Sequence, residues 1–161
     1  MNKKIIFLVV GIFLIVSIGC IYFLRKNTEL SLNNNENLEG ESENMNELKI
    51  KMDINGVSFT VTLIDNETSR ELIDRLPISI IMNELNGNEK YYYFDETLSS
   101  NPNHIGEIHV GDLMLYGNDC LVLFYDDFAT NYRYTKIGSI DHPNNLKDIV
   151  GSGNIKISFT R

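Results

Sequence analysis

The feature that most constrains the fold of this chain is a pair of segments in which apolar and polar residues alternate. Asn55-Gly56 joins the two segments. Apolar residues occupy every second position of residues 48–54 and again of residues 57–63, with polar residues between most of them. A period of two is typical of a strand with one buried face. Asn-Gly is the pair favoured in a two-residue type I′ turn, because both turn positions need a positive φ. Residues 48–63 are therefore predicted to form an antiparallel hairpin.

The remainder of residues 47–161 also consists of short apolar runs separated by turn residues, which predicts further strands. The run CLVLFY at 120–125 is apolar on both faces and is therefore predicted to be a central strand. The other predicted strands are 78–83, 91–94, 107–110, 113–116, 132–140 and 154–159.

Two short helices are predicted between these strands. Thr68 and Glu71 have the spacing of a capping box, and the helical pattern after them stops before a proline, which predicts a helix over 67–76. A proline near its first turn and a glycine just past its end bracket a second helix at 143–150. About eight short strands with two helices indicate a mainly β domain, residues 47–161, folded as a small closed barrel, because closure removes exposed strand edges.

An uncharged run of 20 residues, from Ile5 to Leu24, precedes this domain. As a helix it would rise about 30 Å, which matches the thickness of the hydrocarbon layer of a bilayer. Its apolar residues continue past the only small pair, where a cleaved signal peptide would end. Residues 1–26 are therefore predicted to be an uncleaved signal anchor, with residues 5–24 spanning the membrane once.

The orientation of this span depends on a few basic residues. Lys3 and Lys4 precede it and Arg25 and Lys26 follow it, so the positive-inside rule weighs the two sides almost equally. A short leader with two lysines more often stays in the cytosol, whereas a long following domain translocates largely regardless of charge. We expect a single-pass cell-membrane protein with its soluble domain outside the cytoplasm.

A second form of membrane attachment is lipidation of Cys20. Gly19 and Cys20 match the bacterial lipobox, but Ser17 and Ile18 stand where that motif has a leucine and a small residue. Lipidation of Cys20 stays open as the alternative to its being a small apolar residue of the span.

Residues 27–46 connect the anchor to the β-rich domain. They are rich in Asn and Glu and contain no Lys, Arg or aromatic residue, so they hold too little apolar surface to offset the entropy of ordering. They are predicted to be a flexible linker. The whole chain has a formal net charge of −8, and nucleic acid is therefore not an expected partner.

Four ordered motifs of the domain carry a resemblance to a known family. They are MNELNGNEKY at 82–91, GDLMLYG at 111–117, CLVLFY at 120–125 and GSGN at 151–154. With them, residues 48–160 resemble the bacterial cyclophilin-like fold proteins. The resemblance implies a small eight-stranded barrel of cyclophilin type. In that family the biochemical role is generally not established, and members occur beside or fused to flavodoxin-like domains.

The isomerase chemistry of true cyclophilins would need residues that this chain lacks. Those enzymes hold a proline ring in an apolar pocket while an arginine hydrogen-bonds the twisted peptide. Their Phe-His-Arg stretch and Gln-Gly-Gly-Asp segment do not occur in this sequence. Their pocket Trp has no counterpart either, since the chain has no Trp. Arg133, between Tyr132 and Tyr134, is the only arginine flanked by aromatic residues. A divergent peptidyl-prolyl isomerase using these three residues is kept as an alternative.

Other catalytic signatures are also missing from the sequence. It contains no nucleophile elbow, no phosphate-binding P-loop and no H-E-x-x-H zinc motif. Glu107 and His109 would share one face of a strand while His104 falls in a loop, so no metal site is predicted from these residues and Asp112. Acidic neighbours would raise the pKa of the Cys120 thiol, which predicts an inert cysteine. No cofactor is expected.

The most informative polar segment is residues 84–90, which is followed by three tyrosines. Successive strand residues point to opposite faces, so at least one of the three rings must face away from the core. Tyrosine offers apolar area with a hydrogen-bonding tip, as binding surfaces often do. The alternative is that the amides serve only the turn and that the outward ring pairs across strands. The candidate ligand-binding residues are Glu84, Asn86, Asn88, Tyr91, Tyr92 and Tyr93.

Taken together, these features predict a membrane-tethered, non-catalytic binding or accessory module with a protein or peptide partner. Two alternatives stay open: the divergent isomerase, and an accessory domain for a flavodoxin-like redox partner encoded elsewhere.

Overall fold

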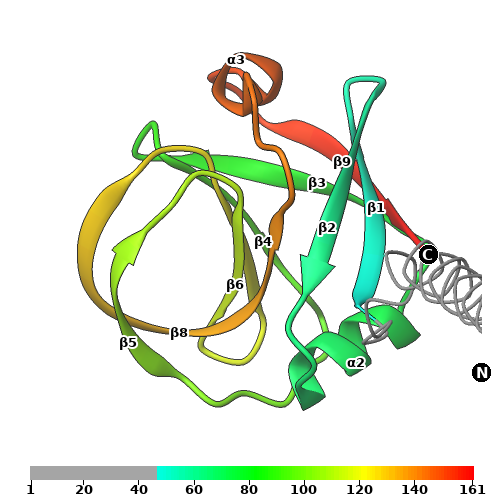
Figure 1. Cartoon of the computed structure of the whole chain (residues 1–161), viewed down its shortest axis with the longest axis vertical. Helices are drawn as coiled ribbons and strands as arrows, with labels where there is room; N and C mark the ends of the chain where they lie inside the picture. The colour runs from blue at the N-terminus through cyan, green and yellow to red at the C-terminus, as the bar shows by residue number, and fades with distance from the viewer. Residues whose placement is uncertain (1–46) are drawn as a thin grey trace, which may run out of the picture. The chain divides into compact units, whose positions relative to one another are not determined.

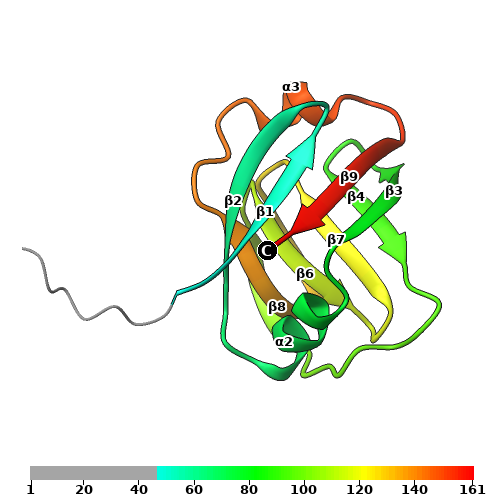
Figure 2. The same ribbon diagram turned by 90° about the vertical axis from the view of Figure 1, so that its right-hand side faces the viewer.

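Residues 47–161 form a closed antiparallel β-barrel (Figures 1 and 2). The structure is a computed structural model and describes these residues. The barrel strands follow one another in the order β2-β1-β9-β3-β4-β7-β6-β8, β2 pairs with β8 to close the ring, and β5 lies outside it against β8. The elements are β1 (Leu48–Ile54), β2 (Val57–Leu63), α2 (Glu67–Asp74), β3 (Ile78–Leu85), β4 (Glu89–Tyr93), β5 (Asn103–Ile108), β6 (Asp112–Tyr116), β7 (Cys120–Phe124), β8 (Phe128–Ile140), α3 (Leu146–Val150) and β9 (Ile155–Thr160).

The opening hairpin and the closed barrel are confirmed. β1 and β2 pair along their whole length, and Asn55 and Gly56 form the turn with φ values of 51° and 81°. All the other predicted strands are present. The largest differences in their ends are at β5 and β8, which begin earlier than predicted. These added residues are strand because β5 and β8 pair with each other there, with His104 opposite Arg133. Neither segment shows the alternation of apolar and polar residues that would have predicted it.

β8 pairs with three strands and bends strongly along its length (Figure 1). Its first half pairs with β5, and its second half pairs with both β6 and β2. Gly138 lies where β2 and β8 meet, and a Cβ atom added to it would come within 2.4 Å of the Thr62 carbonyl oxygen. Because real Cβ atoms do not approach a backbone so closely, only glycine permits the barrel to close in this register.

Helix α2 begins with a different cap from the predicted one. The side chain of Asn66, one residue before the helix, accepts a hydrogen bond from the Ser69 backbone N–H at 2.9 Å. The predicted capping box is therefore wrong. Thr68 and Glu71 instead hold the loop after β4, because Thr68 donates to the Ser99 carbonyl and Glu71 accepts from the Ser99 N–H and hydroxyl.

Helix α3 is shorter than predicted at its beginning. Asn145 has a φ of 59°, in the left-handed region, so regular helix starts only at Leu146. Its end is as predicted, since the N–H of Gly151 donates to the Lys147 carbonyl.

Apolar side chains form two clusters on opposite faces of one wall of the barrel. The larger cluster fills the barrel and includes Leu121 and Leu123 of β7. The smaller one includes Val122 and Phe124 of the same strand, covered by residues of β5 and β8. All five residues of β7 are buried, which confirms the predicted central strand, and the two clusters explain why its sequence is apolar on both faces.

The predictions for residues 1–26, 27–46 and Cys20 lie outside the described residues. Within residues 47–161, no helix is long and apolar enough to cross a membrane.

Candidate functional site

A cavity of about 720 Å³ borders the smaller apolar cluster. Its walls come from β4, β6, β7 and β8, and its rim includes the turn between β3 and β4. A volume of this size is within the range of small-molecule sites, roughly 300–1,000 Å³.

Strand β4 supplies one wall of the cavity, because every second side chain of the strand points to the same face. Glu89, Tyr91 and Tyr93 share one face of the strand and all line the cavity. Tyr91 is opposite Val122 and Tyr93 is opposite Cys120 in the pairing with β7, and both β7 residues also line it. The register of this pairing therefore directs three consecutive odd-numbered side chains of β4 into the same hollow.

Strands β6 and β8 supply a second aromatic wall. Tyr132 and Tyr134 of β8 share a face and line the cavity together with Tyr116, the last residue of β6. The ring centroid of Tyr116 lies 6.0 Å from that of Tyr132 and 5.5 Å from that of Tyr134. On the other wall, the ring centroids of Tyr91 and Tyr93 are 5.7 Å apart. Two groups of tyrosine rings thus border one cavity.

Among the described residues that line the cavity, Glu89 alone is charged. No described residue donates a hydrogen bond to its carboxylate or forms an ion pair with it. Burial, followed by repulsion from Glu84, raises the pKa of Glu89 above its usual range. Burial also raises the pKa of the Cys120 thiol to about 11 and that of Tyr134 to about 12, with the charge of Glu89 contributing to both shifts. Both groups are neutral at pH 7, so Glu89 gives the cavity a negative potential.

The amide residues of the β3–β4 turn form part of the rim. Asn86 lies in the left-handed region with a φ of 56°, as turn residues often do, and both Asn86 and Asn88 line the cavity. The Oδ1 atom of Asn88 is buried and has no hydrogen-bond donor among the described residues. An unpaired buried acceptor is unusual in a native protein, because its desolvation is not compensated.

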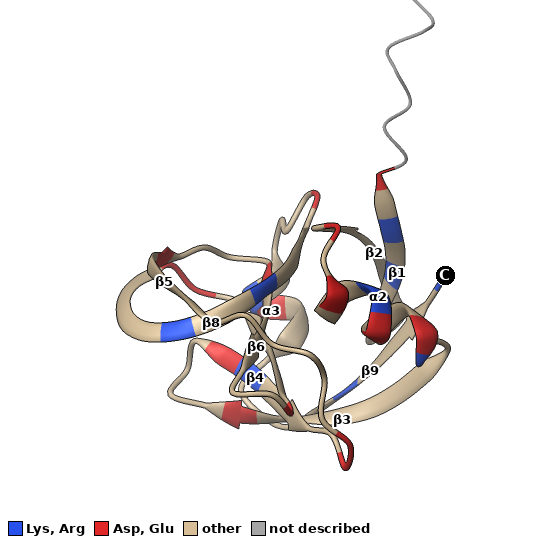
Figure 3. Cartoon of the chain, turned by 90° about the horizontal axis from the view of Figure 1, so that it is seen from below, with Lys and Arg blue, Asp and Glu red and all other residues tan. Residues whose placement is uncertain are grey.

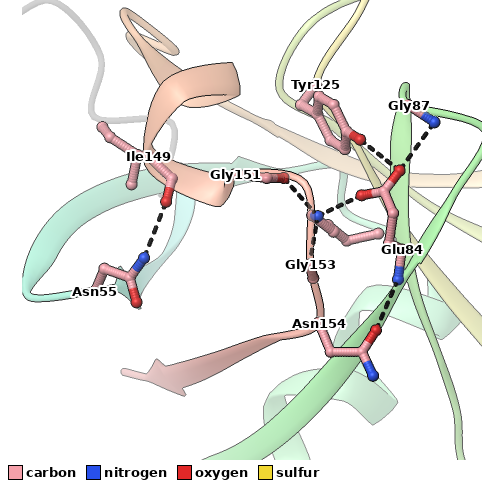
Figure 4. A network of polar contacts seen from close by, with 9 residues as sticks. Asn55, Glu84, Gly87, Tyr125, Ile149, Gly151, Gly153 and Asn154 are labelled. Atoms are coloured by element: carbon pink, nitrogen blue, oxygen red, sulfur yellow. Dashed lines mark hydrogen bonds and ion pairs between the residues drawn. The ribbon is translucent and has the colours of Figure 1, made fainter.

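Glu84 belongs to a separate polar network below the turn (Figure 4). Its carboxylate pairs with the fully buried ammonium group of Lys90 and accepts hydrogen bonds from the Tyr125 hydroxyl and the Gly87 N–H. The same ammonium group donates to the carbonyl oxygens of Gly151 and Gly153, each at 2.7 Å. Burial raises the pKa of Glu84, but the bonds from Lys90, Tyr125 and Gly87 outweigh burial, so the net pKa lies below its usual range.

The structure brings together four of the six candidate binding residues. Asn86, Asn88, Tyr91 and Tyr93 line the cavity, whereas Glu84 takes part in the Lys90 network. Tyr92 points to the opposite face of β4 and packs against the larger apolar cluster.

Of the three residues of the isomerase alternative, two line the cavity and one faces away from it. Tyr132 and Tyr134 line the cavity, but Arg133, between them, faces the other way and donates two hydrogen bonds to the Pro102 carbonyl oxygen, at 2.9 and 3.3 Å. Neither Arg133 nor Lys136, the two basic residues on β8 (Figure 3), lines the cavity.

Sequence reasoning missed Glu89, Tyr116 and Phe128 as residues of this site. The period of two could have placed Glu89 beside Tyr91 and Tyr93. No local signal connects Tyr116 or Phe128 with β4, because closure of the barrel and the bend of β8 bring them there. The fully buried Lys90 was also missed, although a hairpin through Asn86-Gly87 places it directly opposite Glu84.

No cluster of three or more His, Cys, Asp or Glu suited to a metal ion occurs within residues 47–161. Asp112 accepts a hydrogen bond from the His109 backbone N–H and pairs with Lys136. Its carboxylate therefore has structural partners.

The closed eight-stranded barrel with two short helices places the domain in the cyclophilin class of folds. Residues 52–160 match the model of the Cyclophilin-like family, and the chain belongs to that family. A solved structure of a hypothetical protein from Archaeoglobus fulgidus is similar, with a TM-score of 0.51 and 20% sequence identity over 75% of this chain and 99% of the archaeal chain. This likeness shows the fold. No curated protein matches the chain.

Proposed function

We propose that this cyclophilin-like domain is a non-catalytic binding module whose ligand site is the tyrosine-lined cavity. The observation that carries the proposal is the gathering of exposed aromatic surface in one hollow. Tyr93, Tyr116 and Tyr132 are exposed by 56%, 43% and 63% of their surface, and all three line the cavity. Leu85, which is 41% exposed, lines it as well.

These four residues are most of the exposed large hydrophobic residues of the domain. The others within residues 47–161 are Val57, Ile64 and Ile81, and none of them lines this cavity. Single exposed apolar side chains are ordinary on protein surfaces, but a cluster of them in a concave site is typical of a binding site.

The absence of an arginine from the cavity lining favours binding over prolyl isomerisation. No described residue with a guanidinium group lines the cavity, and the guanidinium of Arg133 is bonded to a backbone carbonyl elsewhere. The isomerase and the redox-accessory roles stay predictions, as does a protein or peptide partner.

The proposal includes tethering at a membrane through residues 5–24. Its support is the uncharged run of 20 residues in the sequence. The full chain is expected to stay with the membrane after alkaline carbonate washing and to be released by detergent, and release by carbonate alone would contradict the tether.

Ligand-observed NMR with 2-phenylethanol, a small neutral aromatic probe, tests the binding site. The full chain in nonionic detergent micelles is expected to transfer saturation to the probe, in excess of empty micelles. The double variant Tyr93→Ala/Tyr132→Ala should lose this excess, because both substitutions remove exposed walls of the cavity. Ile81→Ala is the matched control, since it removes an exposed apolar side chain outside the cavity and should leave the signal unchanged. Equal signals from all three proteins would contradict the proposed site.

A further inference from the structure

The charge of the cavity suggests which class of ligand it takes. Glu89 is an acidic group that has no partner among residues 47–161, and no Lys or Arg of that range lines the cavity. Lys90 follows Glu89 in sequence, but its side chain lies on the opposite face of β4, where it pairs with Glu84. The negative charge of Glu89 is therefore not compensated within the domain.

The aromatic walls favour a positive charge in the same place. The face of a tyrosine ring is negative, and cations bind over such faces in aromatic cages. Five of the eight tyrosines of the chain line the cavity. They come from three different strands and form two groups, one on β4 and one on β6 and β8.

The amide oxygen of Asn88 at the rim is not accessible to a ligand. Asn88 lines the cavity, but its Oδ1 is buried. The bond from the Tyr125 N–H to the Asn88 carbonyl, at 2.9 Å, holds the backbone beside Glu89. The carboxylate of Glu89, which has no donor among the described residues, matches a ligand group carrying several N–H bonds.

We propose that the cavity binds a small organic ammonium ion, with its N–H groups at Glu89 and its flat apolar part between the tyrosine walls. This inference rests on the proposed binding function and names its ligand class. A protonated primary or secondary amine fits better than a quaternary one, because only the former donates hydrogen bonds to the carboxylate of Glu89. The volume of about 720 Å³ accommodates a ligand of drug size or smaller.

Calorimetric titration with three compounds that share a phenyl ring tests this proposal. The compounds are 2-phenylethylammonium, 2-phenylethanol and 3-phenylpropanoate, and the protein is the full chain in nonionic micelles, with empty micelles as the blank. The cation should bind about 10-fold more tightly than the alcohol or better, because its hydrogen bonds are charge-assisted. The anion should bind more weakly than either.

Substitution of Glu89 separates the effect of charge from that of shape. Glu89→Gln should reduce the affinity for the cation about 10-fold or more and that for the alcohol much less, because only the cation has a charge that the carboxylate stabilises. Glu107→Gln is the matched control, because it removes an equal charge from an exposed position of β5 outside the cavity. It should leave all three affinities as they are.

The outcomes distinguish the two proposals. Tighter binding of the cation that is lost in Glu89→Gln and kept in Glu107→Gln supports an ammonium site. If the alcohol binds as tightly as the cation, or the anion binds most tightly, the ammonium ligand is contradicted while the binding module stands. If none of the three compounds binds, both proposals are contradicted for ligands of this shape. The comparison of the three compounds on the unaltered chain decides the matter even if a variant fails to fold.

Discussion

At the scale of single residues, two adjacent charges of β4 have opposite environments. The ammonium group of Lys90 is fully buried with one carboxylate and two carbonyl partners, whereas the carboxylate of Glu89 is half-buried without any partner among the described residues. Strand alternation separates them, since Lys90 faces the barrel end and Glu89 faces the cavity. The first arrangement stabilises the fold, and the second keeps a group available for binding.

Replacing Glu89 by Gln should stabilise the domain at neutral pH, by about 1 kcal/mol, the scale of an uncompensated buried polar group. Burial raises the pKa of Glu89, so the folded state binds its proton more tightly than the unfolded state does. The ionised side chain therefore destabilises the fold at pH 7, and this penalty disappears below the ordinary value of 4.5. Thermal unfolding should show a higher Tm for Glu89→Gln at pH 7 and almost equal Tm values near pH 4. A lower Tm at pH 7 would show that Glu89 has a stabilising role.

Replacing Lys90 by Met should destabilise the domain by about 3 kcal/mol or more, because it removes the buried cation from an ion pair. Glu84 would keep only the hydrogen bonds from Tyr125 and Gly87. The carbonyls of Gly151 and Gly153 would lose the donor that Lys90 supplies. Lys49→Met is the control, since Lys49 is exposed and its ion pairs contribute little. Near-UV circular dichroism during heating measures both effects. Equal Tm values for the two variants would contradict the structural role of Lys90.

At the scale of elements, the closing contact between β2 and β8 depends on one position. Gly138→Ala should cost about 3 kcal/mol or more, since the added Cβ would lie 2.4 Å from the Thr62 carbonyl oxygen and 2.9 Å from the Cα of Leu63. Gly153→Ala is the matched control, because a Cβ there has no neighbour within 4 Å. Its Tm should stay close to that of the unaltered protein. Wild-type stability of Gly138→Ala would mean that the two strands are not in this register.

The elements themselves could be predicted wherever the signal is local. The Asn55-Gly56 hairpin and the doubly apolar strand at 120–125 follow from turn chemistry and from alternation. The cap of α2 was missed because Asn66 competes with Thr68 for the same role, and the choice depends on the loop at Ser99. The starts of β5 and β8 were missed because each is set by pairing with the other across more than twenty residues.

At the scale of the whole molecule, the closed barrel was predictable and most of the cavity was not. The sequence placed the tyrosines at 91–93 on a strand, and alternation required that they divide between two faces. It contained nothing that connects them with Tyr116 or Tyr132. Tyr116 and Tyr132 come to line the same cavity only when β6 pairs with both β7 and β8. The same long-range closure turns Arg133 away from the tyrosines that flank it.

Ring shifts of labelled tyrosines test the central claim, that the tyrosine cavity is the ligand site of this domain, most directly. The full chain with 13C-labelled tyrosine rings would be titrated with 2-phenylethanol in nonionic micelles, and the assignments would come from single Tyr→Phe variants. We predict shifts for the rings that line the cavity, at positions 91, 93, 116, 132 and 134, and unchanged signals from Tyr92 and Tyr125 on the other side of the barrel wall. Shifts confined to Tyr92 or Tyr125, or no shifts at saturating probe, would contradict the claim.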